Sequence, residues 1–151
     1  GKTTLVVDLV RYFKSLGVSV ATVKHAHHEF DIDHPGKDSF QHRAAGAAEV
    51  MVVSAKRWAH ICELGDAPEP SLEECIERLG NVDLVLVEGW KHGKHPRLEL
   101  RREVNAAPEL AASDSGIKAI VSDIELPGAP VPVLLRHDIE AIAAFILANA
   151  A

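Results

Sequence analysis

Three residues at the start of the sequence have the types that bind phosphate. Gly1, Lys2 and Thr3 match the last three positions of the phosphate-binding loop G-x-x-x-x-G-K-[S/T], and Thr4 follows them. In that loop backbone N–H groups surround the phosphates, the lysine reaches the outer phosphates, and the hydroxyl binds Mg²⁺. Alone, the match leaves an ordinary helix start as an equal alternative, because a lysine near a helix N-terminus opposes the helix dipole only mildly.

An acidic residue at the end of an apolar run is the second chemical signal. The segment VDLVLVEGW places four aliphatic residues between Asp83 and Glu88, as in a buried parallel strand. In proteins with a phosphate-binding loop, a second strand ends in an acidic residue that lies beside Mg²⁺, usually through a water molecule. Gly89 would let the chain approach a ligand closely. We therefore expect Glu88 on the metal side of the site and interpret Asp83 as a turn residue.

A polar segment over residues 24–36 is rich in histidine and carboxylates. Zinc has to be considered at this density, yet an extended segment would not bring the histidines together, and no cysteine lies nearby. The other hypothesis is a ligand cleft, because the segment follows a strand at the carboxyl edge of the sheet. The histidines are His25, His27, His28 and His34. The residues expected to line the cleft are Lys24, His25, Asp33, Lys37, Asp38 and Arg43.

Periodic apolar residues predict the elements that position these side chains. The recurrence of Leu5, Leu9 and Phe13 predicts a helix over 2–16, ended by Gly17, and the β-branched run after it predicts a strand over 18–23. A helix over 38–47 is expected with Asp38 or Ser39 as its cap. EVMVVSA and RWAHICEL predict a β-hairpin.

The second half of the sequence continues the alternation of helices and strands. Ser71 and Glu74 form the pattern of a capping box for a helix over 72–79, and Asp138 is expected to cap a final helix through about residue 148. Strands are expected at 82–88, 97–101, 118–122 and 131–135. This alternation indicates an α/β fold with a mainly parallel sheet flanked by helices and extended by the hairpin, as one domain over 1–151.

Composition narrows the classes of function. The chain has 151 residues, of which 47% are hydrophobic, and a formal net charge of -6. That charge would repel a phosphate backbone, so we expect no broad nucleic-acid surface. Two cysteines form neither a disulfide framework nor a C-x-x-C site, and no apolar run has membrane-spanning length. The expected location is the cytoplasm, with no membrane partner.

Four stretches together resemble a known family. The run TVKHAHHEFDIDHPGKDSFQHRAAGA, the following RWAHICE, the strand DLVLVEGWKH and the later AIVSD are similar to molybdopterin-guanine dinucleotide biosynthesis protein B, the MobB family. The likeness covers nearly the whole chain, and its K-H-x-H-H…D-x-P-G-K-D-S pattern is far more specific than a phosphate-binding loop.

The resemblance implies an activity and partners. Members of that family are GTP-binding proteins with weak GTPase activity that form dimers through an extended sheet. They are thought to assist the guanylyltransferase that attaches GMP to molybdopterin. The resemblance therefore implies Mg²⁺ and GTP as ligands, a homodimer, and molybdopterin or its guanylyltransferase as a partner.

The same resemblance assigns residues one by one. Gly1, Lys2, Thr3 and Thr4 match the end of the family's phosphate-binding loop, with Lys2 on the β- and γ-phosphates and Thr3 on Mg²⁺. Glu88 and Gly89 match its metal-side motif. The signature loop is matched by Lys24, His25, His28, Asp33, Pro35, Gly36, Lys37, Asp38 and Ser39.

The resemblance is less complete for the residues that would recognise the base and for those that would catalyse hydrolysis. Asp123 stands where guanine-selective relatives have an aspartate that accepts hydrogen bonds from the base, although the usual N-K-x-D is absent. His25 and Asp33 are candidates for the general base, and a partner protein or the second subunit could position the water instead.

The family pattern also places a strand and the G-x-x-x-x portion of the loop before Gly1. Those amides donate most of the phosphate hydrogen bonds. We expect the 151 residues by themselves to bind nucleotide poorly and to be marginally folded, with a central strand missing from the sheet.

Two other functions stay open. A small phosphotransferase could use the same phosphate-binding loop, with Lys37, Arg43 and Arg97 holding an acceptor phosphate. A metal carrier could use the histidine-rich segment to hold nickel or zinc. Acceptor-dependent turnover would indicate the first, and one metal equivalent retained after dialysis would indicate the second.

Overall fold

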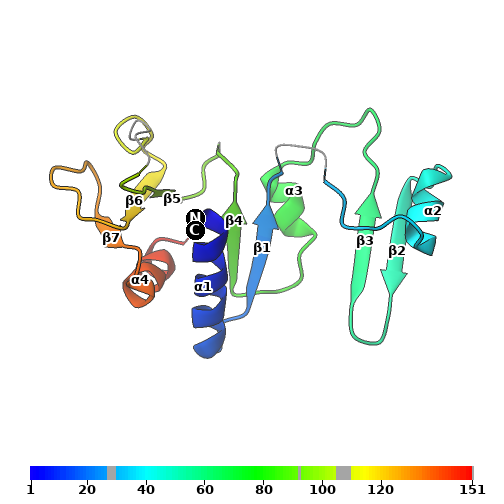
Figure 1. The fold of residues 1–151 in the computed structure, drawn as a ribbon, viewed down its shortest axis with the longest axis horizontal. Coiled ribbons are helices and arrows are strands. Elements are labelled where there is room, and N and C mark those ends of the chain that lie inside the picture. Colours follow the sequence, from blue (N-terminus) through cyan, green and yellow to red (C-terminus); the bar gives the residue numbers. More distant parts are fainter. Residues whose placement is uncertain (27–29, 92, 105–109, 151) are drawn as a thin grey trace. The chain divides into compact units, whose positions relative to one another are not determined.

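The computed structural model describes residues 1–26, 30–91, 93–104 and 110–150. It divides into two compact units, one formed by Gly1–His25 with Ile76–Ala151 and the other by Ala26–Cys75. Each unit is described by itself, and the single domain expected from the sequence stays a prediction. The elements in chain order are α1 (Lys2–Ser15), β1 (Val20–Lys24), α2 (Asp38–Ala44), β2 (Glu49–Val53), β3 (Trp58–Cys62), α3 (Leu72–Glu77), β4 (Leu84–Glu88), β5 (Arg97–Leu100), β6 (Ile117–Ser122), β7 (Val133–Leu135) and α4 (Ile139–Asn149) (Figure 1).

The first helix forms as its apolar period predicts. Leu5, Leu9 and Phe13 are buried along one face of α1. The helix ends where the N–H of Val18 turns back to the carbonyl of Phe13, at 3.0 Å, with Gly17 between them in a left-handed conformation. This cap occupies the residues just before β1, so the strand begins at Val20 rather than at residue 18.

All strands of the larger unit pair in parallel, which confirms the α/β fold class. The strand β1 pairs with β4, and β5, β6 and β7 form a second sheet in that order. Among the described residues, no backbone pairing joins β4 to β5, so the single sheet expected from the sequence is two sheets in this structure. No described helix is both long enough and apolar enough to cross a membrane.

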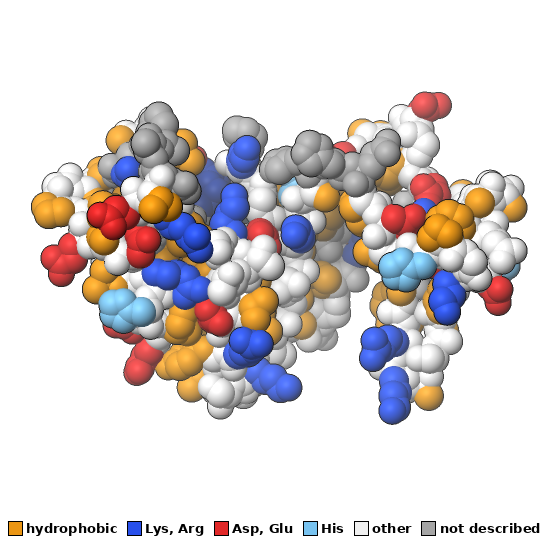
Figure 2. Space-filling model, viewed as in Figure 1, with side chains coloured by type: hydrophobic (Ala, Val, Ile, Leu, Met, Phe, Trp, Pro, Cys, Tyr) orange, Lys and Arg blue, Asp and Glu red, His pale blue; other side chains and the backbone are white. Residues whose placement is uncertain are grey.

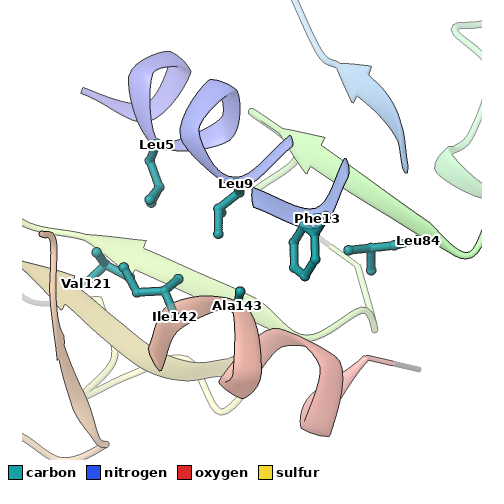
Figure 3. Packing of buried hydrophobic residues seen from close by; sticks show 7 residues of the cluster. All are labelled: Leu5, Leu9, Phe13, Leu84, Val121, Ile142 and Ala143. Atoms are coloured by element: carbon teal, nitrogen blue, oxygen red, sulfur yellow. The ribbon is translucent and has the colours of Figure 1, made fainter. Parts of the chain in front are cut away.

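One apolar cluster joins the helices to both sheets. Figure 3 shows side chains of α1 and α4 pointing toward Leu84 of β4 and Val121 of β6. Each fully buried side chain of this size contributes about 1.5–3 kcal/mol relative to exposure, so the cluster fixes α1 against the strands. The buried members are Leu5, Leu9, Phe13, Leu84, Val121, Ile142 and Ala143. The cap of α4 is confirmed, because the Asp138 side chain accepts a hydrogen bond from the Ala141 N–H.

The smaller unit contains the predicted hairpin. The strands β2 and β3 pair antiparallel, with Val53 opposite Trp58. Figure 2 shows basic side chains at the hairpin tip and apolar side chains on its surface. The expected cap of α2 is wrong: Lys37 is the N-cap residue and makes no side-chain cap, while Asp38 lies in the first turn. The Ser39 hydroxyl is instead bonded to Asp33 at 3.0 Å.

The capping box before α3 is confirmed. The Ser71 N–H donates to the Glu74 carboxylate at 2.7 Å, and the Glu74 N–H donates to the Ser71 hydroxyl at 3.2 Å. The helix ends at Glu77, two residues earlier than expected, because the chain continues as a turn in which the Leu79 N–H reaches the Ile76 carbonyl.

Candidate functional site

The phosphate-binding residues form the first turn of α1. Lys2 begins the helix and is exposed, and the Leu5 N–H is the donor that reaches back to the Gly1 carbonyl. The first N–H groups of a helix lack partners within the helix and carry its positive dipole end, so this turn favours an anion. The Thr4 hydroxyl accepts a hydrogen bond from the Gly1 nitrogen at 3.3 Å.

A hydrogen bond joins this turn to the end of β4. The Thr3 hydroxyl donates to a carboxylate oxygen of Glu88 at 3.0 Å. Parallel pairing of β1 with β4 sets Lys24 opposite Glu88, so a cation lies on the neighbouring strand end. The structure thus brings together Thr3, Lys24 and Glu88, three of the residues expected from the sequence. The hydroxyl and the carboxylate are oxygen donors, which suit Mg²⁺.

A groove of about 460 Å³ opens beside these residues. Its polar lining includes Thr3 and Glu88, and its apolar lining is made of valine side chains from α1 and β1. The lining residues are Thr3, Val6, Val7, Val10, Arg11, Thr22, Val23, Lys24 and Glu88. The apolar part would leave a bound polar group in a partly dehydrated setting, which strengthens charge interactions.

The strand ends behind the site are held together by main-chain contacts. The His25 N–H donates to the Glu88 carbonyl at 2.8 Å. Gly89 has φ of +92°, and a Cβ there would lie 2.8 Å from the His25 carbonyl oxygen. Glycine is required at this position for both reasons. The neighbour that Gly89 admits in this structure is the His25 backbone, and a close approach to a ligand stays a prediction.

Asp123 follows β6 in the same unit. One of its carboxylate oxygens accepts a hydrogen bond from the Glu103 N–H at 3.0 Å. The side chain is exposed and keeps its second oxygen for another donor. Its role in guanine recognition stays a prediction.

Asp33 and Lys37 belong to the smaller unit, so their placement is described only there. The Asp33 side chain is 8% exposed, and one oxygen accepts hydrogen bonds from the Ser39 hydroxyl and the His34 N–H, both at 3.0 Å. The other oxygen lies 3.7 Å from an Arg43 guanidinium nitrogen. This buried carboxylate organises the segment before α2, and a catalytic role for it stays a prediction.

The sequence did not indicate that Arg43 holds its own unit together. Its guanidinium donates to Asp31 at 2.8 and 3.1 Å and to Glu63 at 2.7 Å. The hydrogen bond from Arg43 and that from the Asp33 backbone lower the pKa of Asp31 to about 2. Binding a phosphate at Arg43 would require displacing these carboxylates.

The other arginine of the phosphotransferase hypothesis is also engaged. Arg97 donates to both oxygens of Asp114, at 2.6 and 2.8 Å, and to the Gly93 carbonyl at 2.7 Å. A bidentate pair of this kind is among the stronger hydrogen-bonded contacts in proteins. These contacts argue against Arg43 and Arg97 as holders of an acceptor phosphate.

The histidine-rich segment lies partly within the described residues. His27 of this segment, and His28, which was also matched to the signature loop, lie outside the described residues. Within the described ranges, no group of three or more histidine, cysteine, aspartate or glutamate side chains is arranged to hold a metal ion.

A protein-family model decides which family the chain belongs to. The model described as "Molybdopterin guanine dinucleotide synthesis protein B" matches residues 1–123. The chain belongs to the MobB family. The match contains the four stretches that carried the resemblance, among them the histidine-rich segment and the strand ending in Glu88, and it also includes the start of α1.

Relatives and solved structures agree with membership of the MobB family. A molybdopterin-guanine dinucleotide biosynthesis adapter protein of Escherichia coli (strain K12) is 37% identical over 150 residues, covering 97% of this chain and 85% of that protein. The protein of the same name from Haemophilus influenzae (strain ATCC 51907 / DSM 11121 / KW20 / Rd) is 33% identical over 129 residues, covering 83% of this chain and 70% of that protein.

The fold is shared with solved members of the MobB family. A crystal structure of molybdopterin-guanine biosynthesis protein B has a TM-score of 0.74 at 27% identity, covering 97% of this chain and 91% of its own. Bacillus subtilis MobB has a TM-score of 0.75 at 22% identity, covering all of this chain and 91% of its own, a likeness of fold alone.

One residue of the site was missed by the sequence reasoning. Trp90 follows Gly89, and its ring centroid lies 4.8 Å from that of His25. The signal was available, since an aromatic residue directly after an acidic strand end and a glycine stands at the carboxyl edge of the sheet.

Proposed function

We propose that this protein is a GTP-binding adapter in molybdenum cofactor biosynthesis. The observation that carries the proposal is the contact of Thr3 with Glu88, which joins a G-K-T helix start to an acidic strand end. Relatives named molybdopterin-guanine dinucleotide biosynthesis adapter proteins support the pathway.

The geometry supports binding of Mg²⁺ and the nucleotide phosphates. The first turn of α1 would receive the phosphates, with the Lys2 ammonium neutralising the outer ones. Thr3 would hold Mg²⁺ directly and Glu88 through a water molecule, replacing the hydrogen bond between them. The bound ion would neutralise charge on the phosphates.

Hydrolysis is expected to be slow. Of the two candidate bases, His25 lies at the end of β1, in the unit that contains Thr3, and Asp33 lies in the other unit with one oxygen already bonded. Unassisted GTPases of this class turn over on the order of 10⁻⁴ to 10⁻² per second, because water positioning and arginine supply are incomplete. A partner protein or the second subunit would complete the site.

Guanine selectivity is assigned to Asp123. Its free carboxylate oxygen can accept from the N1–H and N2–H₂ groups of guanine, a donor pair that adenine lacks. Asp123, directly after the buried end of β6, is itself exposed, which would give a base access to it.

We assign homodimerisation to the hairpin of β2 and β3. Val53 and Trp58 face each other across it and are 70% and 64% exposed. Large apolar side chains on an open two-stranded sheet are a typical association surface. Val53→Lys should shift sedimentation to the monomer, while Val104→Lys, at a valine of the other unit that is 84% exposed, should not. Equal sedimentation of both variants would exclude the hairpin.

The proposed adapter role is tested with the molybdopterin guanylyltransferase of the same source. Adding the complete protein and Mg·GTP should raise the yield of molybdopterin guanine dinucleotide, and the two proteins should co-purify. Lys2→Ala should remove the enhancement, while Lys14→Ala, in the last turn of α1, should keep it. No enhancement by the unaltered protein, or full enhancement by Lys2→Ala, would contradict the proposal.

The location of this reaction in the cytoplasm stays a prediction from the sequence.

A further inference from the structure

An aromatic pair lies at the edge of the site. The rings of His25 and Trp90 are 4.8 Å apart with their planes tilted by 41°, and both residues are half-buried. Tilted arrangements at this separation are favourable for aromatic rings. The pair connects the residue after β1 to the second residue after β4.

The main chain around the pair leaves His25 little freedom. Its N–H is bonded to the Glu88 carbonyl at 2.8 Å, and the missing side chain of Gly89 lets the His25 carbonyl approach. The backbone of His25 is therefore fixed by Glu88 and Gly89, and the orientation of its ring is set by rotation about the side-chain bonds, which contact with Trp90 restricts.

Core packing does not explain this contact. Neither of the two buried clusters of the larger unit includes Trp90 or His25 among its described members. Trp90 instead packs against the imidazole of a residue whose main-chain N–H is bonded to the carbonyl of Glu88, so the contact fits a role in orienting that imidazole. The charged side chains on the adjoining strand ends are Lys24 and Glu88.

We propose that Trp90 is a positioning residue that holds the imidazole of His25 next to the strand end carrying Glu88, in register for the outer phosphate of the nucleotide. This inference rests on the proposed GTP binding and deepens it. His25 touches the ligand, and Trp90 acts through His25. The pair thereby limits the orientations of the imidazole before the ligand arrives, which lowers the cost of ordering it.

The kinetic test compares two substitutions of Trp90 in the complete protein. Trp90→Ala should lower kcat for GTP hydrolysis about 10-fold, a part of what a positioned acid or base contributes, with KM within about twofold. Trp90→Phe keeps an aromatic ring and should restore most of the rate. Leu147→Ala removes an exposed apolar side chain of α4, outside the proposed site and the hairpin, and should leave both constants unchanged.

A double mutant separates positioning from general destabilisation. If Trp90 acts through His25, then Trp90→Ala should cost nothing further in a His25→Ala background. Independent, multiplicative losses would overturn the inference. So would a Trp90→Ala variant with an unchanged kcat.

An NMR measurement tests the geometry without nucleotide. The ring current of Trp90 should displace the His25 Hε1 resonance, so Trp90→Ala should shift that resonance and Trp90→Phe should largely keep it. An unmoved His25 resonance in Trp90→Ala would overturn the inference.

The inference and the proposed function can fail separately. If the unaltered protein does not bind Mg·GTP, both are wrong. If it binds Mg·GTP but Trp90→Ala leaves the kinetics unchanged, only the inference is wrong.

Discussion

The hydroxyl of Thr3 and the carboxylate of Glu88 lie 3.0 Å apart, although 85 positions separate them in the chain. The contact exists because α1 packs on the strand pair of β1 and β4, and because β4 ends at Glu88. It brings a phosphate-binding helix start to an acidic strand end.

The Thr3 hydroxyl is predicted to be essential for Mg²⁺-dependent binding. Thr3→Val keeps the shape and removes the ligand oxygen, so the Kd for Mg·GTP should rise about 10-fold to 100-fold, the range for a lost contact with a charged group. Thr3→Ser keeps the hydroxyl and should bind nearly as the unaltered protein does. Fluorescent GTP analogues would measure both, and equal affinity of Thr3→Val and Thr3→Ser would contradict the assignment.

Gly89 is predicted to tolerate no side chain. Gly89→Ala meets both a positive φ and a Cβ 2.8 Å from the His25 carbonyl oxygen. Gly128 also has a positive φ, +81°, but has open space around it. Gly128→Ala therefore measures the cost of the positive φ alone, without a steric contact. We expect Gly128→Ala to cost about 1–2 kcal/mol in the free energy of unfolding and Gly89→Ala clearly more. Urea unfolding measures both, and equal losses would show that the close contact is unimportant.

The elements that the sequence predicted well are those with an internal period or cap. The face of α1 with Leu5, Leu9 and Phe13, the capping box of Ser71 and Glu74, and the capping by Asp138 are local patterns, and all are present. The helix cap assigned to Asp38 or Ser39 is wrong: the helix starts one residue earlier, after Lys37, and the Ser39 hydroxyl donates instead to Asp33 in the preceding segment. Local propensity is overridden where a buried carboxylate needs a donor.

The candidate site divides in the same way. Thr3 and Glu88 were foreseen, because each ends an element whose place in an α/β sheet is set by general rules. Two sets of contacts were not foreseen: the tilted ring contact of Trp90 with His25, and the hydrogen bonds from Arg43 to Asp31 and Glu63. Both depend on side-chain directions, which spacing along the chain does not fix. Asp83 was interpreted only as a turn residue; that its carboxylate accepts hydrogen bonds from the N–H and hydroxyl of Ser19, 64 positions away, at 2.8 and 2.6 Å, was not foreseen.

Arg43 is predicted to control the titration of Asp31. The pKa of Asp31 is lowered from 3.8 to about 2, first by the hydrogen bond from Arg43. Since the folded pKa lies below the unfolded value, the stabilisation from this carboxylate is complete above about pH 4 and is lost as the pH falls toward 2.

Carboxyl-carbon NMR shifts would follow that titration. In Arg43→Gln the pKa of Asp31 should move back toward 3.8. The pKa of Asp83, which hydrogen bonds from Ser19 lower, provides an internal control and should stay where it is. An unchanged titration of Asp31 in Arg43→Gln would refute the pairing in solution.

Asp123 is predicted to set the preference for guanine. Asp123→Ala should reduce the GTP-over-ATP preference by about 10-fold or more, because two hydrogen bonds to a charged acceptor are lost. Asp123→Asn keeps an acceptor for the Glu103 N–H and removes the charge, so it should keep the fold while losing most of the preference. Competition between GTP and ATP measures this, and an unchanged ratio in Asp123→Ala would remove Asp123 from the base site.

The central claim is that Thr3 and Glu88 form the metal side of a guanine-nucleotide site. Isothermal titration calorimetry of the complete protein with GTP, with and without Mg²⁺, tests it most directly, using Glu88→Gln and the exposed Glu125→Gln as a matched pair. The account predicts binding that Mg²⁺ strengthens in the unaltered protein and in Glu125→Gln, and a much smaller Mg²⁺ effect in Glu88→Gln. GTP binding that is equally tight without Mg²⁺, or an undiminished Mg²⁺ effect in Glu88→Gln, would contradict it.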